Sequence, residues 1–336
     1  MSMKLLIITQ TVDTADPILG FFVQWIAELS KHFERVEVIA LGVGQYELPV
    51  NVRVHSLGKE GGAASRAAYA WRFLRLVWAL RRDYDAVFVH MNEEYVLLAG
   101  LLWQLLDKRI YMWRNHYAGS WRTRVAAAFC TKVFCTSKHS YTARFKNTVL
   151  MPVGVDTDRF KPYASVLRAP RSVLFLARMA PSKRPEMLLD ALEVLAQDGV
   201  DFSADFVGSP LPQDAAWYEA LNERAAPLAP RVRFLQGVPN AETLRLYQSH
   251  QIFVNASPSG MFDKTLFEAA ACGAIVLSSS KDFVALAGQD TYFDSAETLA
   301  ARLRTALGGL TQTAVPAFVA ENSLYALSGK LAKTLY

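Results

Sequence analysis

Residues 174 to 186 have the sequence Leu-Phe-Leu-Ala-Arg-Met-Ala-Pro-Ser-Lys-Arg-Pro-Glu. An apolar run typical of a strand leads into a loop with Arg178 and Lys183, and a helical pattern then begins. Ligands of open parallel sheets bind at the carboxyl ends of the strands, so both cations would converge on an anion near the next helix N-terminus. The pattern alone is weak, because Arg and Lys at this spacing also occur by chance in surface loops.

Strand-like runs alternate with helical patterns on both sides of this stretch, which predicts parallel sheets covered by helices. The strands expected before it are 5–9, 36–41, 52–57, 86–91, 110–113 and 133–136, and those from Pro170 onward are 173–177, 204–207, 232–235, 252–255 and 275–278. A chain of 336 residues exceeds the size at which a single core stops growing. We therefore expect an α/β protein with two doubly wound, Rossmann-like domains.

The segment 152–170 separates the two series of strands. It contains three prolines and no clean period, as expected of a linker. This places one domain at 1–155 and a second at 165–315, followed by a final segment at 316–336 in which 321–336 has helical character.

Composition indicates a folded chain, because 52% of its residues are hydrophobic and 20% are charged. The net charge of +5 would suit anionic nucleotides, nucleic acid or anionic lipid, and does not choose among them. Cys130, Cys135 and Cys272 lack the paired spacing of a zinc site, so we expect buried reduced thiols. The apolar run after Lys4 is too short for a signal peptide. A cytoplasmic location is expected.

Two further segments give the first one meaning. They are Met-Pro-Val-Gly-Val-Asp-Thr-Asp-Arg-Phe at 151–160 and Phe-Asp-Lys-Thr-Leu-Phe-Glu-Ala-Ala-Ala-Cys-Gly at 262–273. In this order and spacing, the three segments resemble the retaining nucleotide-sugar glycosyltransferases of family 4, which have the GT-B fold. The segment at 151 resembles the family's PNGVD sequence, with Val153 in place of asparagine. The segment at 262 resembles the end of its Glu-x7-Glu motif, with Glu268 as the second glutamate.

The resemblance implies an N-terminal acceptor-binding domain and a C-terminal donor-binding domain that face a central cleft, with residues 316–336 crossing back to the first domain. It implies transfer of a sugar from a UDP or GDP type donor to a hydroxyl of a glycan or lipid-linked glycan, a hexosyltransferase reaction. The sequence offers no evident carboxylate nucleophile, which favours front-face transfer with retention. No cofactor is expected, and nucleic acid is not an expected partner.

The resemblance also assigns residues to roles. Arg178 and Lys183 would hold the departing diphosphate, with backbone amides of Thr265 and Leu266 as further donors, and Glu268 would accept hydrogen bonds from the ribose. No metal is expected, because the two cations neutralise the diphosphate. Two Asp-x-Asp patterns, at 83–85 and 156–158, match the manganese motif of another glycosyltransferase fold and are expected to be decoys.

The chain departs from the family pattern in two places. The first motif glutamate is replaced by Gly260, so Asp263, Lys264 or the backbone of Gly260 and Met261 would have to contact the donor sugar. The first loop, rich in glycine in many members, offers only Gly20 to the phosphate site. A catalytically silent nucleotide-sugar binding protein, or an epimerase or hydrolase of the same fold, is consistent with these losses. NAD is not an expected ligand, since no Gly-x-Gly-x-x-Gly follows the first strand.

Three more features come from the first half. His116 follows a strand and resembles the family's cleft histidine near the reacting sugar, although a buried structural histidine is the alternative. In 63–82, Arg72, Arg75 and Arg82 share a helical face flanked by Trp71 and Trp78, which fits either an anionic membrane surface or an ordinary sheet-packed helix. The apolar segment 95–106 is too short to span a membrane and is expected in the core. Peripheral association with the inner membrane face is therefore one expectation.

Overall fold

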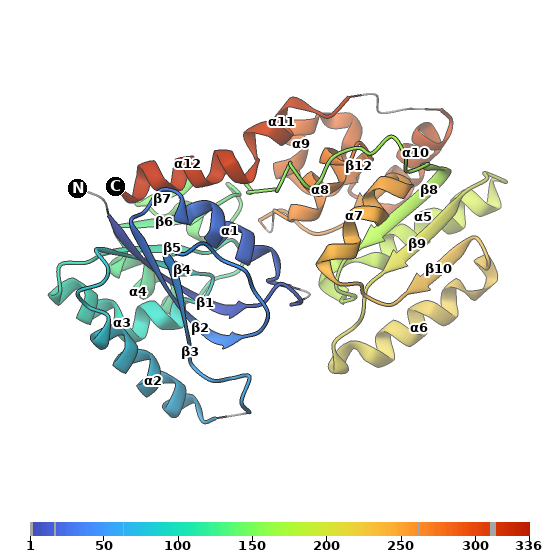
Figure 1. Cartoon of the computed structure of the whole chain (residues 1–336). Helices are drawn as coiled ribbons and strands as arrows, with labels where there is room; N and C mark the ends of the chain where they lie inside the picture. The colour runs from blue at the N-terminus through green and yellow to red at the C-terminus, as the bar shows by residue number, and fades with distance from the viewer. Residues whose placement is uncertain (1–2, 17, 63, 261, 310–313) are drawn as a thin grey trace. The chain divides into compact units, whose positions relative to one another are not determined.

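The computed structural model describes residues 3–16, 18–62, 64–260, 262–309 and 314–336. The chain divides into two compact units (Figure 1). The first unit comprises Met1–Gly154 together with Leu324–Tyr336, and the second is Val155–Ser323.

The first unit is built on a seven-stranded sheet in which every described pairing is parallel, in the order β3-β2-β1-β4-β5-β6-β7. Its strands are β1 (Lys4–Val12), β2 (Arg35–Val43), β3 (Val52–Ser56), β4 (Ala86–His90), β5 (Arg109–Trp113), β6 (Lys132–Cys135) and β7 (Thr148–Leu150). Its helices are α1 (Phe21–Ser30), α2 (Arg66–Ala79), α3 (Glu93–Leu105), α4 (Trp121–Phe129) and α12 (Leu324–Leu335). The six strands predicted here are present, and β7 was missed because three residues are too few for a recognisable pattern.

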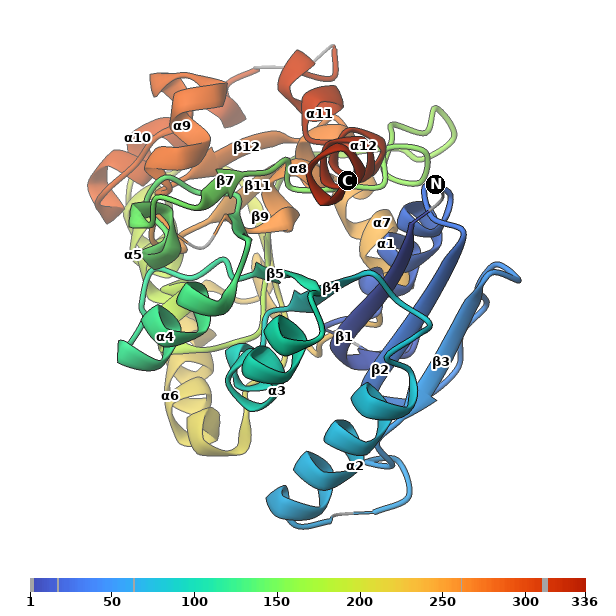
Figure 2. The same ribbon diagram turned by 90° about the vertical axis from the view of Figure 1, so that its left-hand side faces the viewer.

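Both faces of this sheet are covered, which explains why its strands are apolar without alternation. Leu5 and Ile7 face α1 and α12, whereas Leu6 and Ile8 face α2, α3 and α4. Figures 1 and 2 show α2, α3 and α4 together on one side of the sheet.

The second unit has a five-stranded parallel sheet in the order β10-β9-β8-β11-β12. Its strands are β8 (Ala169–Leu176), β9 (Ser203–Val207), β10 (Val232–Leu235), β11 (His250–Asn255) and β12 (Ile275–Ser278). Its helices are α5 (Pro185–Gln197), α6 (Ala215–Ala225), α7 (Asn240–Ser249), α8 (Lys264–Ala271), α9 (Lys281–Ala287), α10 (Ala296–Leu307) and α11 (Ala317–Glu321). All five predicted strands are present, so the expected class of two Rossmann-like parallel-sheet domains is confirmed.

The element boundaries differ from the predicted ones in two places. The second unit already begins at Val155, and β8 begins at Ala169 inside the segment expected to be a linker. The helix expected over 321–336 is interrupted at Asn322 and Ser323, so α11 belongs to the second unit and only α12 to the first. Leu327, Leu331 and Leu335 of α12 are buried in the first unit's core.

The prediction that 95–106 lies in the core is only half right. Val96, Ala99 and Trp103 of α3 are buried against the sheet, but the leucines on its outer side are not. Leu98, Leu101 and Leu105 are 45%, 63% and 77% exposed. No helix among the described residues is both long and apolar enough to cross a membrane.

Candidate active site

Arg178 lies two residues beyond the end of β8, at the carboxyl edge of the second sheet. Its side chain is exposed and makes no hydrogen bond or ion pair with any described residue. Gly208, at the end of β9, lets this loop approach closely, since a Cβ there would lie 1.8 Å from the carbonyl oxygen of Ala177. The two loops therefore lie close together, and the guanidinium of Arg178 is accessible to an anion.

Lys183 lies in the same loop but is not available in the same way. Its Nζ lies 2.7 Å from Oδ2 of Asp263 and donates to Ser257 Oγ at 3.1 Å. The same Oδ2 accepts from Ser257 Oγ at 2.6 Å and from Asn255 Nδ2 at 3.0 Å. Burial acts to raise the pKa of Asp263, but Lys183 and the two hydrogen bonds outweigh it and hold that pKa below its usual value. Asp263 is therefore an ionised carboxylate that neutralises Lys183.

Arg184 is a third cation at this edge, which the sequence analysis missed. It has a left-handed backbone with φ of 51° at the start of α5. Its Nε donates to the carbonyl of Ala256 and its Nη2 to Ser279 Oγ, both at 2.6 Å. Burial lowers its pKa. Arg184 joins the loops after β8, β11 and β12, a role that no local sequence pattern signals.

The N-terminus of α8 contains the two backbone donors expected at the phosphate. Asp263 is the N-cap residue, but its side chain caps no amide because it is turned to Lys183. The Leu266 N–H reaches the Asp263 carbonyl at a long 3.3 Å, and the Thr265 N–H has no acceptor among the described residues. An uncapped N-terminus is suited to an anion.

Glu268 faces inward from α8 and is only 5% exposed, so it is not an ordinary surface glutamate. Its Oε2 accepts from the Tyr247 hydroxyl at 3.1 Å. Burial raises the pKa of Glu268, with Lys264 one turn earlier and Tyr247 opposing the shift. Burial also lowers the pKa of Lys264 to about 8. The two residues form a desolvated pair beside the α8 N-terminus.

Gly260 does not provide the donor that was expected of its backbone. Its N–H donates to Asp282 Oδ2 at 3.1 Å, which ties the 256–263 loop to the start of α9. Its φ of +91° favours glycine, so a glutamate here would be strained. Met261 lies outside the described residues.

Two candidate residues belong to the first unit. The Nδ1 of His116 lies 2.9 Å from the backbone nitrogen and 3.2 Å from the carbonyl oxygen of Ala118. The ring stacks on Tyr117 with centroids 4.5 Å apart. The Gly20 N–H donates to the Asp16 carbonyl at 3.0 Å, and a Cβ on Gly20 would lie 2.7 Å from that oxygen. Gly20 is therefore needed for a tight turn, and its amide is already used.

Both Asp-x-Asp segments have structural partners. Asp83 pairs with Arg35 and Asp85 accepts from the Lys4 N–H, whereas Asp156 accepts from the N–H groups of Asp158 and Arg159. Within the described residues, no three His, Cys, Asp or Glu side chains are grouped as metal ligands. The three cysteines are buried thiols, as expected.

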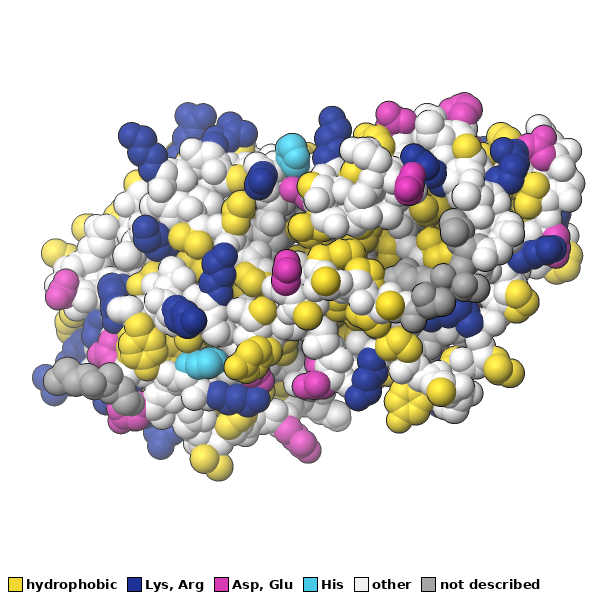
Figure 3. All heavy atoms as spheres, turned by 90° about the horizontal axis from the view of Figure 1, so that it is seen from above, with side chains coloured by type: hydrophobic (Ala, Val, Ile, Leu, Met, Phe, Trp, Pro, Cys, Tyr) yellow, Lys and Arg dark blue, Asp and Glu magenta, His cyan; other side chains and the backbone are white. Residues whose placement is uncertain are grey.

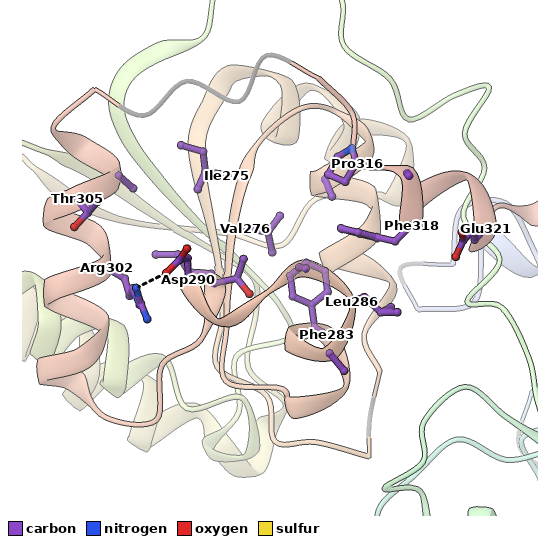
Figure 4. A pocket seen from close by; sticks show the side chains of 17 residues that line it. Ile275, Val276, Phe283, Leu286, Asp290, Arg302, Thr305, Pro316, Phe318 and Glu321 are labelled. Carbon is purple, nitrogen blue, oxygen red and sulfur yellow. Dashed lines mark hydrogen bonds and ion pairs between the residues drawn. The ribbon is translucent and has the colours of Figure 1, made fainter.

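A cavity of about 860 Å³ lies elsewhere in the second unit, beside the edge strand β12 (Figure 4). Phe283, Leu286 and Phe318 form much of its apolar wall, and Arg302 pairs with Asp290 at one end. None of the predicted site residues lines it. The cavity is therefore separate from the residues that were predicted to bind the donor.

Comparison with known proteins finds relatives of the second unit in particular. The family model described as glycosyl transferases group 1 matches residues 170–308. D-inositol 3-phosphate glycosyltransferase of Geodermatophilus obscurus is 30% identical to the chain over 154 residues, which cover 42% of the chain and 34% of that protein. The enzyme of the same name from Streptomyces avermitilis is 30% identical over 158 residues, covering 43% and 34%. The match thus spans about a third of these relatives' length.

Solved structures extend the likeness to the whole chain. Anabaena HepE in complex with UDP and glucose superposes with a TM-score of 0.76 and 19% identity, covering 99% of both chains. A glycosyltransferase from Rickettsia africae gives 0.74 and 16%, covering 99% of this chain and 98% of that one. These likenesses show that the chain has the GT-B fold.

Proposed function

We propose that the chain is a retaining glycosyltransferase that moves a hexose from a nucleoside-diphosphate sugar to a hydroxyl acceptor. The observation that carries this proposal is the carboxyl edge of the second sheet, where Arg178, Lys183 and the uncapped α8 N-terminus come from neighbouring loops. The group 1 domain over 170–308 supports it.

The chemical task is to stabilise the charge of the departing diphosphate. The planar guanidinium of Arg178 can hold two phosphate oxygens, and the ammonium of Lys183 can follow the β-phosphate. The Thr265 N–H adds a neutral donor at the positive end of α8. Glu268, held by Tyr247, accepts the ribose hydroxyls, and His116 orients the sugar. The acceptor proton passes to the leaving phosphate, so no protein nucleophile is required.

For the donor we favour a UDP-sugar over a GDP-sugar, because HepE was solved with UDP and with UDP-glucose. For the acceptor we favour a glycan or lipid-linked glycan. A galactosyltransferase of the lipopolysaccharide outer core, covered at 99% with a TM-score of 0.69, is among the similar structures. The relatives that act on D-inositol 3-phosphate make a polyol phosphate the second acceptor to test.

We also propose a cytoplasmic protein that associates peripherally with an anionic membrane through α2. Trp71 and Trp78 are exposed, with Arg75 stacked over Trp71 at 4.9 Å and Arg81 over Trp78 at 4.4 Å. Arg72 is not part of this surface, since its Nη1 donates to the Leu57 carbonyl at 2.7 Å. Figure 3 views the face that carries α12, where Lys and Arg side chains are dispersed and form no continuous patch.

Sugar release from labelled donors, with and without acceptor, tests the proposed reaction. A transferase gives product that depends on the acceptor, a hydrolase releases sugar without it, and a silent binding protein does neither. We expect transfer to persist in excess EDTA, because fixed cations do the work of a metal. Loss of transfer in EDTA and its recovery with manganese would contradict this mechanism.

A further inference from the structure

In the candidate site, Lys183 and Asp263 form an ion pair, although the proposed reaction needs the ammonium of Lys183 for the diphosphate. The ammonium already contacts the carboxylate of Asp263 and the hydroxyl of Ser257. The side chains of Lys183 and Asp263 are only 17% and 21% exposed, so the pair is largely desolvated. In such surroundings a carboxylate and a phosphate compete strongly for one ammonium.

The position of Asp263 in the helix points the same way. An aspartate at an N-cap ordinarily accepts from the first amides of its own helix, which stabilises the helix. Asp263 forgoes that contact and leaves the α8 N-terminus without a side-chain cap. Its carboxylate is thus placed on Lys183, while the Thr265 N–H has no acceptor among the described residues.

The ammonium of Lys183 can also move away while the carboxylate of Asp263 still accepts hydrogen bonds. Asp263 Oδ2 keeps its hydrogen bonds from Ser257 and Asn255 when Lys183 departs. The lysine chain is long and flexible, whereas Asp263 is held by the backbone at the start of α8. Only Lys183 needs to move.

We propose that Asp263 is an internal counter-ion for Lys183, and that the donor diphosphate binds by taking the ammonium away from it. The inference rests on the proposed function, because the competing anion is the diphosphate of the donor. No bond forms or breaks, and one anion replaces another on the same cation.

The test measures binding of UDP, GDP and inorganic pyrophosphate by calorimetry to the full chain. Pyrophosphate reports the phosphate site whatever base the donor carries. Asp263→Asn keeps the shape and removes the competing charge, so we expect it to bind pyrophosphate and the preferred nucleotide about tenfold more tightly. An aspartate with a purely structural role would give weaker binding when replaced.

Two further variants make the result specific. Asp282→Asn removes another carboxylate from the same loop cluster, one that holds Gly260 and not Lys183, and should bring no tightening. In a Lys183→Met background, Asp263→Asn should no longer tighten binding. Equal or weaker binding by Asp263→Asn, with wild-type binding intact, overturns the counter-ion proposal alone. Failure of the wild type to bind any of the three ligands overturns the donor site itself.

Discussion

Arg178 and Lys183 lie in one loop but differ in their side-chain contacts. Their substitutions should therefore have different effects on stability. Arg178 has no partner among the described residues, whereas Lys183 is paired with a largely buried carboxylate. The sequence predicts that both can be removed without harm to the fold. The structure supports that expectation for Arg178 only.

We predict that Arg178→Ala and Lys183→Ala each lower kcat/KM by two to three decades, since each removes a preorganised charge from the leaving group, worth about 3 to 4 kcal/mol. Arg178→Ala should leave the free energy of unfolding unchanged. Lys183→Ala should also destabilise the fold by about 1 kcal/mol, because Asp263 loses its counter-ion but keeps its hydrogen bonds from Ser257 and Asn255. Steady-state kinetics and urea unfolding measure the two effects, and adding Asp263→Asn to Lys183→Ala should restore stability but not activity. Wild-type turnover in either single variant would remove that residue from the mechanism.

We predict that Glu268→Gln raises the KM for donor more than it lowers kcat, because ribose contacts are similar in the ground and transition states. Tyr247→Phe is the matched control, since it removes the hydrogen bond to Glu268 but keeps the carboxylate. Its effect on KM should be smaller. A large fall in kcat with an unchanged KM would instead give Glu268 a role in the chemical step.

Lys183 and Asp263 also show where sequence reasoning stops. Arg178 and Lys183 could be recognised because they are close in sequence and follow an apolar strand. The partner of Lys183 is 80 residues away, and only the sheet order brings the loops after β8 and β11 together. Asp263 was selected as a substitute for the missing glutamate, which stays a prediction, and its ion pair with Lys183 was not foreseen. Arg184 was missed because its role depends on carbonyl and hydroxyl acceptors that no motif encodes.

At the scale of elements, the strands were predictable and the helix surfaces were not. Buried parallel strands are apolar on both faces, so they stand out as short continuous runs. A helix such as α3 is apolar all round, which usually means burial. Its outer leucines are nevertheless exposed. Hydrophobicity alone cannot tell a buried face from one that is left uncovered.

The layer formed by α2, α3 and α4 is the part of the protein that we predict to contact an anionic membrane. Exposed apolar side chains occur on all three neighbouring helices, together with arginines that would attract anionic lipid. We expect the protein to co-sediment with anionic and not with neutral liposomes, and to be released by salt, since each arginine near the surface contributes about 1 kcal/mol.

Two variants locate that contact. A triple substitution to Glu should abolish binding to anionic liposomes when it replaces Arg66, Arg75 and Arg82. A triple substitution to Ser should weaken that binding when it replaces Leu98, Leu101 and Leu105. Leu167→Ser, an equally exposed apolar site in the second unit, is the control and should bind as wild type. Equal binding to neutral vesicles, or none to either kind, would make this layer an ordinary covering of the sheet.

In the whole molecule, the two units differ in whether they are formed by one continuous segment of the sequence. The second unit is one uninterrupted segment, whereas the first needs α12 from beyond it. We predict that residues 155–323 expressed alone fold cooperatively and bind the donor nucleotide. Residues 1–154 alone should not, because α12 supplies Leu327, Leu331 and Leu335, whose loss costs about 2 to 5 kcal/mol each against a typical domain stability of about 5–15 kcal/mol. Circular dichroism melts of both fragments check this, and a stably folded 1–154 fragment would contradict it.

The late position of α12 has a consequence for synthesis on the ribosome. The residues of α12 are made after every residue of the second unit, so the nascent first sheet must wait for the helix that covers part of one face. Until then the apolar surface around Leu5 and Ile7 lacks part of its cover and is open to chaperones. The order of folding would therefore reverse the order of translation, with the unit made second reaching its native state first.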